Sequence, residues 1–141
     1  MKLYSRIMVL TLFIFLGSLL MCNPDTLVDK ADGTLWGQIA PGEAAGRKGP
    51  LIVVAAHTNE LDKIDWNRNR DELNTFGNYE INELIGGKYY IAAHQDGNRN
   101  NQRDAGEYWG GYDANGDGRL DPVTLDGGKS VRKDIAFFRS F

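Results

Sequence analysis

Apolar and polar residues alternate over several short stretches of the chain, and a period of two residues predicts β-strands. Residues 77–83 show the pattern most clearly, because Tyr79 and Ile81 fall on one face of the pleat and polar residues on the other. Residues 33–40 alternate in the same way. Residues 50–57 form a continuous apolar run of strand length, which is typical of a strand buried on both faces.

Further strands are predicted towards the C-terminus. A glycine turn after residue 84 leads into an apolar stretch at 88–95, and residues 122–125 and 131–138 are predicted to form a final hairpin. Residues 58–74 have no strand pattern and are interpreted as a long loop or a turn or two of helix. Because the helical period is absent elsewhere, we predict an all-β fold, a single small antiparallel β-sandwich of about seven strands.

Residues 96–121 interrupt this pattern with a long insert that is rich in Asp, Asn and Gly. A calcium loop of the EF-hand type places oxygen ligands at positions 1, 3, 5, 7, 9 and 12, the seventh through its backbone carbonyl. Counting from Asp96, these positions are occupied by Asp96, Asn98, Asn100, Gln102, Asp104 and Glu107. Arg99 and Arg103 fall between ligand positions and are expected to point away. Position 6 is Asn101, which tolerates the left-handed backbone region almost as well as glycine.

A second loop of the same kind begins at Asp113. Its expected ligands are Asp113, Asn115, Asp117, the backbone carbonyl of Arg119, and Asp121. Gly118 occupies position 6, but position 12 is Thr124, so another carboxylate or water has to complete the shell. The second loop resembles the DxNxDGxxD calcium loops of secreted bacterial modules. The sequence therefore predicts one or two bound Ca²⁺ ions, with a set of plain Asx turns as the alternative.

The N-terminus predicts export. Lys2 and Arg6 precede the uncharged run 7–21, and a basic start followed by a short apolar segment is typical of a secretory signal, an uncleaved membrane anchor being the alternative. Cys22 is the only cysteine in the chain and follows this run directly. The segment resembles a bacterial lipobox, which implies a lipid on Cys22 and a membrane-anchored protein in the cell envelope. Met21 departs from the small residue usual at that position, so cleavage without lipidation stays open.

The remaining chain is organised as a short tether at 22–31 and one domain at 32–141. Loss of residues 1–21 leaves 120 residues, enough for one hydrophobic core. It also leaves 14 Lys and Arg against 19 Asp and Glu, a net charge of −5. An acidic domain has no electrostatic reason to bind nucleic acid.

The strand pattern is similar to that of bacterial carboxypeptidase-regulatory-like domains, which have a transthyretin-like (prealbumin-like), Ig-like β-sandwich. The resemblance is carried by the spacing Gly77-x-Tyr79-x-Ile81-x-x-Leu84-x-x-Gly87-x-Tyr89-x-Ile91, and the first strand by Gly33-x-Leu35-x-Gly37-x-Ile39. The first acidic loop also resembles calcium loops that follow a strand in such domains. This resemblance implies a structural, adhesive or binding module more often than an enzyme.

Two alternatives to a purely structural module remain. Trp66 and Trp109 lie beside polar residues, and if exposed they could bind carbohydrate or a protein partner. His57 and His94 each end an Ala-Ala-His tripeptide and could meet at one end of the sandwich as a hydrolase site. The transthyretin fold also hosts 5-hydroxyisourate hydrolases, although the tail of this chain shares little with theirs. We therefore predict a non-enzymatic, calcium-binding module.

Overall fold

The computed structural model describes residues 29–140, with the side chains of 137–140 left out, so the predicted signal segment 1–21 and the lipid-anchor site Cys22 lie outside the described residues. The protein is all-β, as predicted. Its strands are β1 (Ala31–Ala40), β2 (Leu51–Ala56), β3 (Arg70–Leu73), β4 (Asn78–Ile85), β5 (Gly87–Gln95), β6 (Tyr108–Gly111), β7 (Pro122–Leu125), β8 (Ser130–Arg132) and β9 (Ile135–Ser140). Two short 3-10 turns complete the described elements, η1 (Gly42–Ala44) and η2 (Leu61–Lys63). No helix in this part of the chain is long and apolar enough to cross a membrane.

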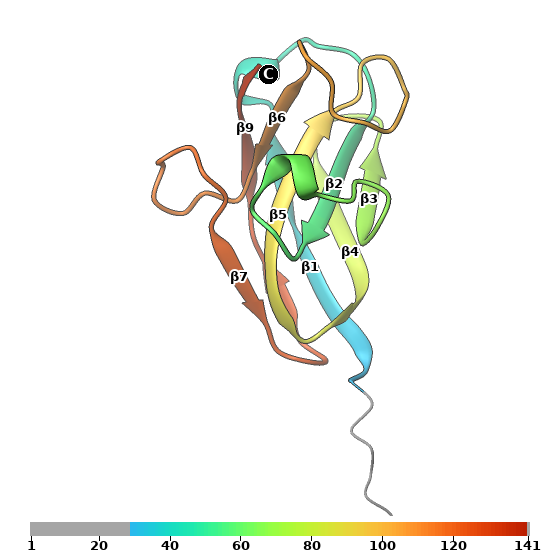
Figure 1. Ribbon diagram of the computed structural model, residues 1–141, viewed down its shortest axis with the longest axis vertical. Coiled ribbons are helices and arrows are strands. Elements are labelled where there is room, and N and C mark those ends of the chain that lie inside the picture. Colours follow the sequence, from blue (N-terminus) through green and yellow to red (C-terminus); the bar gives the residue numbers. More distant parts are fainter. Residues whose placement is uncertain (1–28, 141) are drawn as a thin grey trace, which may run out of the picture.

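The nine strands form one curled sheet in the order β3-β2-β5-β6-β9-β1-β4, with β7 beside β5 and β8 beside β1 (Figure 1). The sheet is mixed, because β1 pairs in parallel with β8 and β9. The prediction of a purely antiparallel sheet is therefore wrong. The predicted final hairpin is also wrong. β7 pairs with β5 and β8 with β1, so the glycine turn between them carries the chain from one arm of the sheet to the other.

The curl brings the two arms face to face around one core. β4 pairs with β1 and β5 with β2, so consecutive strands β4 and β5 lie in different arms and are joined by a short glycine connection. Their inward residues follow the predicted alternation. The core contains Leu35, Ile39, Leu51, Val53, Tyr79, Ile81, Leu84, Tyr89, Ile91, Val123, Leu125 and Ile135.

The short strand β3 closes the open side of this sandwich and was not predicted. Its Asp71 carboxylate accepts the backbone N–H groups of Glu72 and Glu80, both at 2.8 Å. Glu80 lies on β4, the last strand at the other end of the sheet. Unpaired strand edges recruit other chains, and a carboxylate that occupies an edge N–H reduces that hazard. β3 therefore both extends one arm and blocks the edge of the other.

A second hydrophobic layer lies on the outer face of β2 and β5. Residues 57–69, which include η2, run across this face, and we call them the cover segment (Figure 1). The layer consists of Ile52, Val54, Ile64, Trp66, Ala92, Trp109 and Leu120. β2 is therefore buried on both faces, as its continuous apolar run predicted.

Candidate metal centre

The acidic insert is two separate loops joined by a strand. β6 lies between them and pairs with β5 and β9. It was not predicted, because residues 96–121 were interpreted as a single insert. The first loop spans 96–107 and the second 113–121. Each loop begins directly after a strand or beside one, so the first aspartate of each is held by the sheet.

In the first loop the first aspartate organises the backbone. Asp96 is only 1% exposed, and its two carboxylate oxygens accept the N–H groups of Asn100 at 3.1 Å and Asn101 at 2.8 Å. Asn101 has a positive φ of 58°, so it takes the tight-turn role usually given to glycine. Asn101 therefore adopts the left-handed conformation that asparagine was expected to tolerate at this position.

The remaining predicted ligands of the first loop turn towards one another. The amides of Asn98 and Asn100 both donate to Asp104 Oδ2, at 2.8 and 2.6 Å. Both hydrogen bonds lower the pKa of the Asp104 carboxyl and keep it ionised. Glu107 folds back over the loop and accepts the N–H of Gly97 at 2.7 Å and that of Asp104 at 3.0 Å. The loop is thus closed from its last residue to its second.

The second loop repeats this arrangement. Asp113 accepts the N–H groups of Gly116 and Gly118, each at 2.7 Å, and that of Asp117 at 3.2 Å. Burial raises the pKa of the Asp113 carboxyl, but these backbone donors lower it by more, so its pKa lies below the usual range. Gly118 has a φ of 79° and makes the turn that Asn101 makes in the first loop.

The two loops match position by position. At position 3, Asn98 and Asn115 accept the N–H of position 5, at 3.1 and 2.9 Å. At position 5, Asn100 and Asp117 accept the N–H of position 7, at 2.8 and 2.9 Å. The same side-chain acceptors and backbone donors therefore recur in the same register in both loops.

The second loop closes earlier than the spacing of an EF-hand predicts. Thr124, at position 12, lies within β7 opposite Lys88 and cannot fold back over the loop. Asp121, at position 9, instead accepts the N–H of Ala114 at 2.7 Å. Glu107 makes the equivalent bond to position 2 of the first loop. Asp121 therefore makes the closing bond that Glu107 makes in the first loop, and the second loop closes within nine residues.

A cation site in these loops would need a mixed set of oxygen donors. Among residues 29–140, no three Asp, Glu, His or Cys side chains converge closely enough to hold an ion by themselves. A site in either loop would need amide and backbone carbonyl oxygens as well, which are ligands that Ca²⁺ accepts and Zn²⁺ does not favour. The repeated 1, 3 and 5 positions supply these oxygens from Asp and Asn side chains.

One arginine of the first loop reaches outside the loop to the cover segment. The Arg103 side chain is only 6% exposed, and its Nη2 lies 2.7 Å from Oδ1 of Asp62 in η2. A long side chain with an apolar stem gains by lying along the second hydrophobic layer while its charge meets a partner. Arg103 therefore ties the first loop to the cover segment, and Asp62 is a residue that the sequence gave no reason to select.

Changing Arg103 to methionine should loosen the cover segment. The Asp62 side chain is 90% exposed, so solvent screens the ion pair and its contribution is about 1 kcal/mol. Amides of 61–66 should therefore exchange about fivefold faster in Arg103→Met. Hydrogen–deuterium exchange followed by mass spectrometry of peptides measures this. Arg99→Met is the matched control, because Arg99 belongs to the same loop and is exposed. Equal protection in both variants would contradict the tie.

The structure does not bring the two histidines together. β2 and β5 are antiparallel, so the ends of the two tripeptides lie at opposite ends of the strand pair, about 16 Å apart for five residues. His57 is exposed and its Nδ1 lies 3.1 Å from the carbonyl oxygen of Lys88. His94 is fully buried against Trp66, with ring centroids 4.5 Å apart, and burial lowers its pKa to about 4. The two rings therefore do not share one site, as the alternative of a hydrolase would require.

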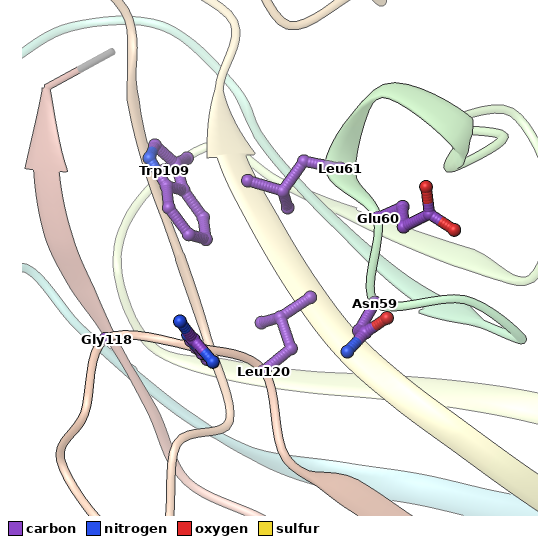
Figure 2. Close-up of a pocket in the computed structure, with 7 residues that line it drawn as sticks. Asn59, Glu60, Leu61, Trp109, Gly118 and Leu120 are labelled. Atoms are coloured by element: carbon purple, nitrogen blue, oxygen red, sulfur yellow. The ribbon is translucent and has the colours of Figure 1, made fainter.

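The two tryptophans selected from the sequence are buried rather than exposed. Trp66 and Trp109 are 8% and 7% exposed. Trp66 of the cover segment and Trp109 of β6 both pack in the second hydrophobic layer, with residues of β2 and β5. Trp109 still lines a groove of about 360 Å³ between the cover segment and the second loop. Figure 2 shows its indole converging there with Leu61 and Leu120. The groove therefore has the second loop on one side and the cover segment on the other. Arg103 connects that cover segment to the first loop.

Comparison with known protein families, with curated proteins and with solved structures finds no match for this chain.

Proposed function

We propose that the protein is a non-enzymatic calcium-binding β-sandwich module with a structural or adhesive role in the cell envelope. The proposal is supported by one observation above the others. Two loops with different sequences make the same side-chain to backbone hydrogen bonds at positions 1, 3 and 5, and each is closed by an acid on the N–H of position 2. An ion in either loop would take its ligands from these carboxylate and amide oxygens together with a backbone carbonyl.

The proposed binding residues follow from this geometry. In the first loop they are Asp96, Asn98, Asn100, the carbonyl of Gln102, Asp104 and Glu107, and in the second Asp113, Asn115, Asp117, the carbonyl of Arg119, and Asp121. Three carboxylates crowd each loop, and a divalent cation would offset their repulsion. Because both loops contact the cover segment, calcium would stabilise the second hydrophobic layer as well as the loops.

Calcium should raise the thermal stability of the purified protein. With Ca²⁺ at about 100 times the dissociation constant, one site adds roughly 2.7 kcal/mol, and Tm should rise by about 10 °C over the sample in EDTA. Scanning calorimetry measures the shift, and native mass spectrometry counts the ions. Magnesium at the same concentration is the control and should give a smaller rise, because Mg²⁺ requires a more rigid octahedral shell. Equal Tm values with Ca²⁺ and EDTA would reject the proposal.

The location in the envelope is a separate part of the proposal and depends on the N-terminal sequence. A basic start, an apolar run and Cys22 are typical of an exported lipoprotein. We propose that residues 22–31 tether the sandwich to a bacterial membrane through a lipid on Cys22. Mass spectrometry of the mature N-terminus tests this, since a diacyl or triacyl mass on Cys22 supports the anchor and an unmodified start at residue 22 or 23 refutes it.

A further inference from the structure

One tryptophan that the sequence analysis did not select lies on the surface. Trp36 is 39% exposed, and it and Ile85 are the two large apolar residues exposed within the described chain. Trp36 lies in the middle of β1, on the face opposite to the buried residues Leu35 and Ile39. Its neighbours on this face, Thr34 and Gln38, are polar, so the core does not require an indole here.

Polar side chains of three strands surround Trp36. Glu80 of β4 is paired with it on one side and Arg132 of β8 on the other. The polar residues around it on the outward face are Thr34, Gln38, Asn78, Asn82 and Ser130, and Ile85 lies at the far end of β4, opposite Ala31. Thr34 Oγ1 donates to Asn82 Oδ1 at 2.8 Å, which fixes the amide on the sheet. We call this surface of β4, β1 and β8 the Trp36 face.

The indole is held in place by its neighbours. The Arg132 guanidinium carbon lies 5.2 Å from the ring centroid, within the range of a cation–π contact. Asp134 in turn accepts from Nε and Nη2 of Arg132, both at 3.1 Å. A side chain restrained in this way loses less entropy when a ligand stacks on it.

The chemistry of the Trp36 face discriminates among ligand classes. The core of a protein–protein interface is apolar and several residues wide, whereas here one indole stands among amides, hydroxyls and single charges. Nucleic acids and anionic membranes require clustered cations, and Arg132 is paired with Asp134. A flat array of amide, hydroxyl and carboxylate groups around one aromatic ring matches a neutral polyhydroxylated ligand. Such a ligand offers C–H groups to the ring and hydroxyls to the surrounding polar groups.

We propose that the Trp36 face binds a neutral glycan, with one sugar ring against the part of the indole that Arg132 leaves exposed and neighbouring hydroxyls on Glu80, Gln38 and the asparagines of β4. None of these residues belongs to either acidic loop. The site is therefore separate from the proposed calcium sites, and it replaces the buried Trp66 and Trp109 as the carbohydrate-binding candidate.

Affinity gel electrophoresis of the purified protein tests the proposal. The gels contain soluble α-1,4-glucan, β-1,3-glucan, β-1,4-xylan or galactomannan, and a casein gel is the protein arm. At least one polysaccharide should retard the wild-type protein, and Trp36→Ala should weaken that binding at least about tenfold. Trp36→Phe should keep part of the retardation. Ile85→Ala, the other exposed apolar residue, should bind as the wild type does.

Every other result of these gels either supports glycan binding at the Trp36 face or overturns it. Wild-type migration unchanged by all four polysaccharides overturns the proposal, as does retardation by casein alone. Retardation that survives in Trp36→Ala places the sugar elsewhere and also overturns it. Calorimetric Tm values should be alike for Trp36→Ala and the wild type, because the indole lies outside the core. Binding that persists in EDTA would separate this site from the calcium loops.

Discussion

Replacing Asp121 with alanine should remove the Ca²⁺ ion proposed for the second loop and leave the one proposed for the first. Asp121 closes the second loop by accepting the N–H of Ala114, as Glu107 closes the first. Without it the second loop keeps carboxylates at Asp113 and Asp117, and the charge count that sets calcium affinity falls by a third. We expect the affinity of that loop to fall about 100-fold and that of the first loop to stay unchanged. Isothermal calorimetry gives both constants and native mass spectrometry the ion count.

Two control variants test the shortened loop against the EF-hand register. Thr124→Ala alters the position where an EF-hand would place its terminal acid, and calcium binding should not change because Thr124 belongs to β7. Asp126→Ala removes the same kind of charge from an exposed position outside the loop. A loss of affinity in Thr124→Ala with none in Asp121→Ala would show that the loop closes at position 12 after all.

The contrast between Asp121 and Thr124 shows where sequence reasoning reached its limit. Side-chain spacing selected the first five proposed ligand positions of each loop, because every second residue of a tight loop is expected to face inward. It did not predict where the second loop ends, because that depends on β7, whose start at Pro122 removes the next residues from the loop. The end of the loop is thus determined by a strand pairing with β5, more than 30 residues earlier in the sequence.

The same distinction between local sequence pattern and tertiary pairing explains which strands were predicted and which were missed. Those with a clear apolar pattern, β1, β2, β4 and β5, were predicted to within two residues. β3 was missed because its sequence, Arg-Asp-Glu-Leu, has almost no apolar residue and depends on pairing with β2. β6 was missed because its glycines pack between neighbouring strands, and a methyl group on Gly111 would collide with the carbonyl oxygen of Ile91. Short strands chosen by tertiary contacts leave little local pattern.

The orientation of single side chains was the least predictable feature. Trp66 and Trp109 are flanked by polar residues, yet the cover segment buries both. Trp36 could have been found, since the alternation that placed Leu35 and Ile39 inside places Trp36 outside. The alternation within a strand is a stronger indicator of exposure than the polarity of neighbouring residues, because the pleat determines the direction of each side chain.

Gly37→Ala should have the largest effect on stability of any single change considered. Between β8 and β9 the chain passes against this glycine of β1, at a point we call the crossing. A methyl group on Gly37 would collide there with the backbone carbonyl of Lys133. The crossing cannot move away easily. Lys133 N–H donates to the Trp36 carbonyl at 2.7 Å, and its own carbonyl accepts the Tyr79 hydroxyl at 2.6 Å. We expect a loss of at least about 3 kcal/mol in the free energy of unfolding, because overpacking against backbone has no cheap relaxation.

Urea unfolding at saturating calcium measures this loss, with Gly77→Ala as the matched control. Gly77 precedes β4, and an added methyl group there would meet no atom within 4 Å, so its variant should stay within about 1 kcal/mol of the wild type. Equal losses in the two variants would contradict the role of the crossing. The crossing also carries Arg132 and Asp134 to the Trp36 face, and Asp134 Oδ1 accepts the N–H of Gln38 at 2.9 Å. If Gly37→Ala folds at all, its shifted crossing should therefore weaken glycan binding, whereas Gly77→Ala should not.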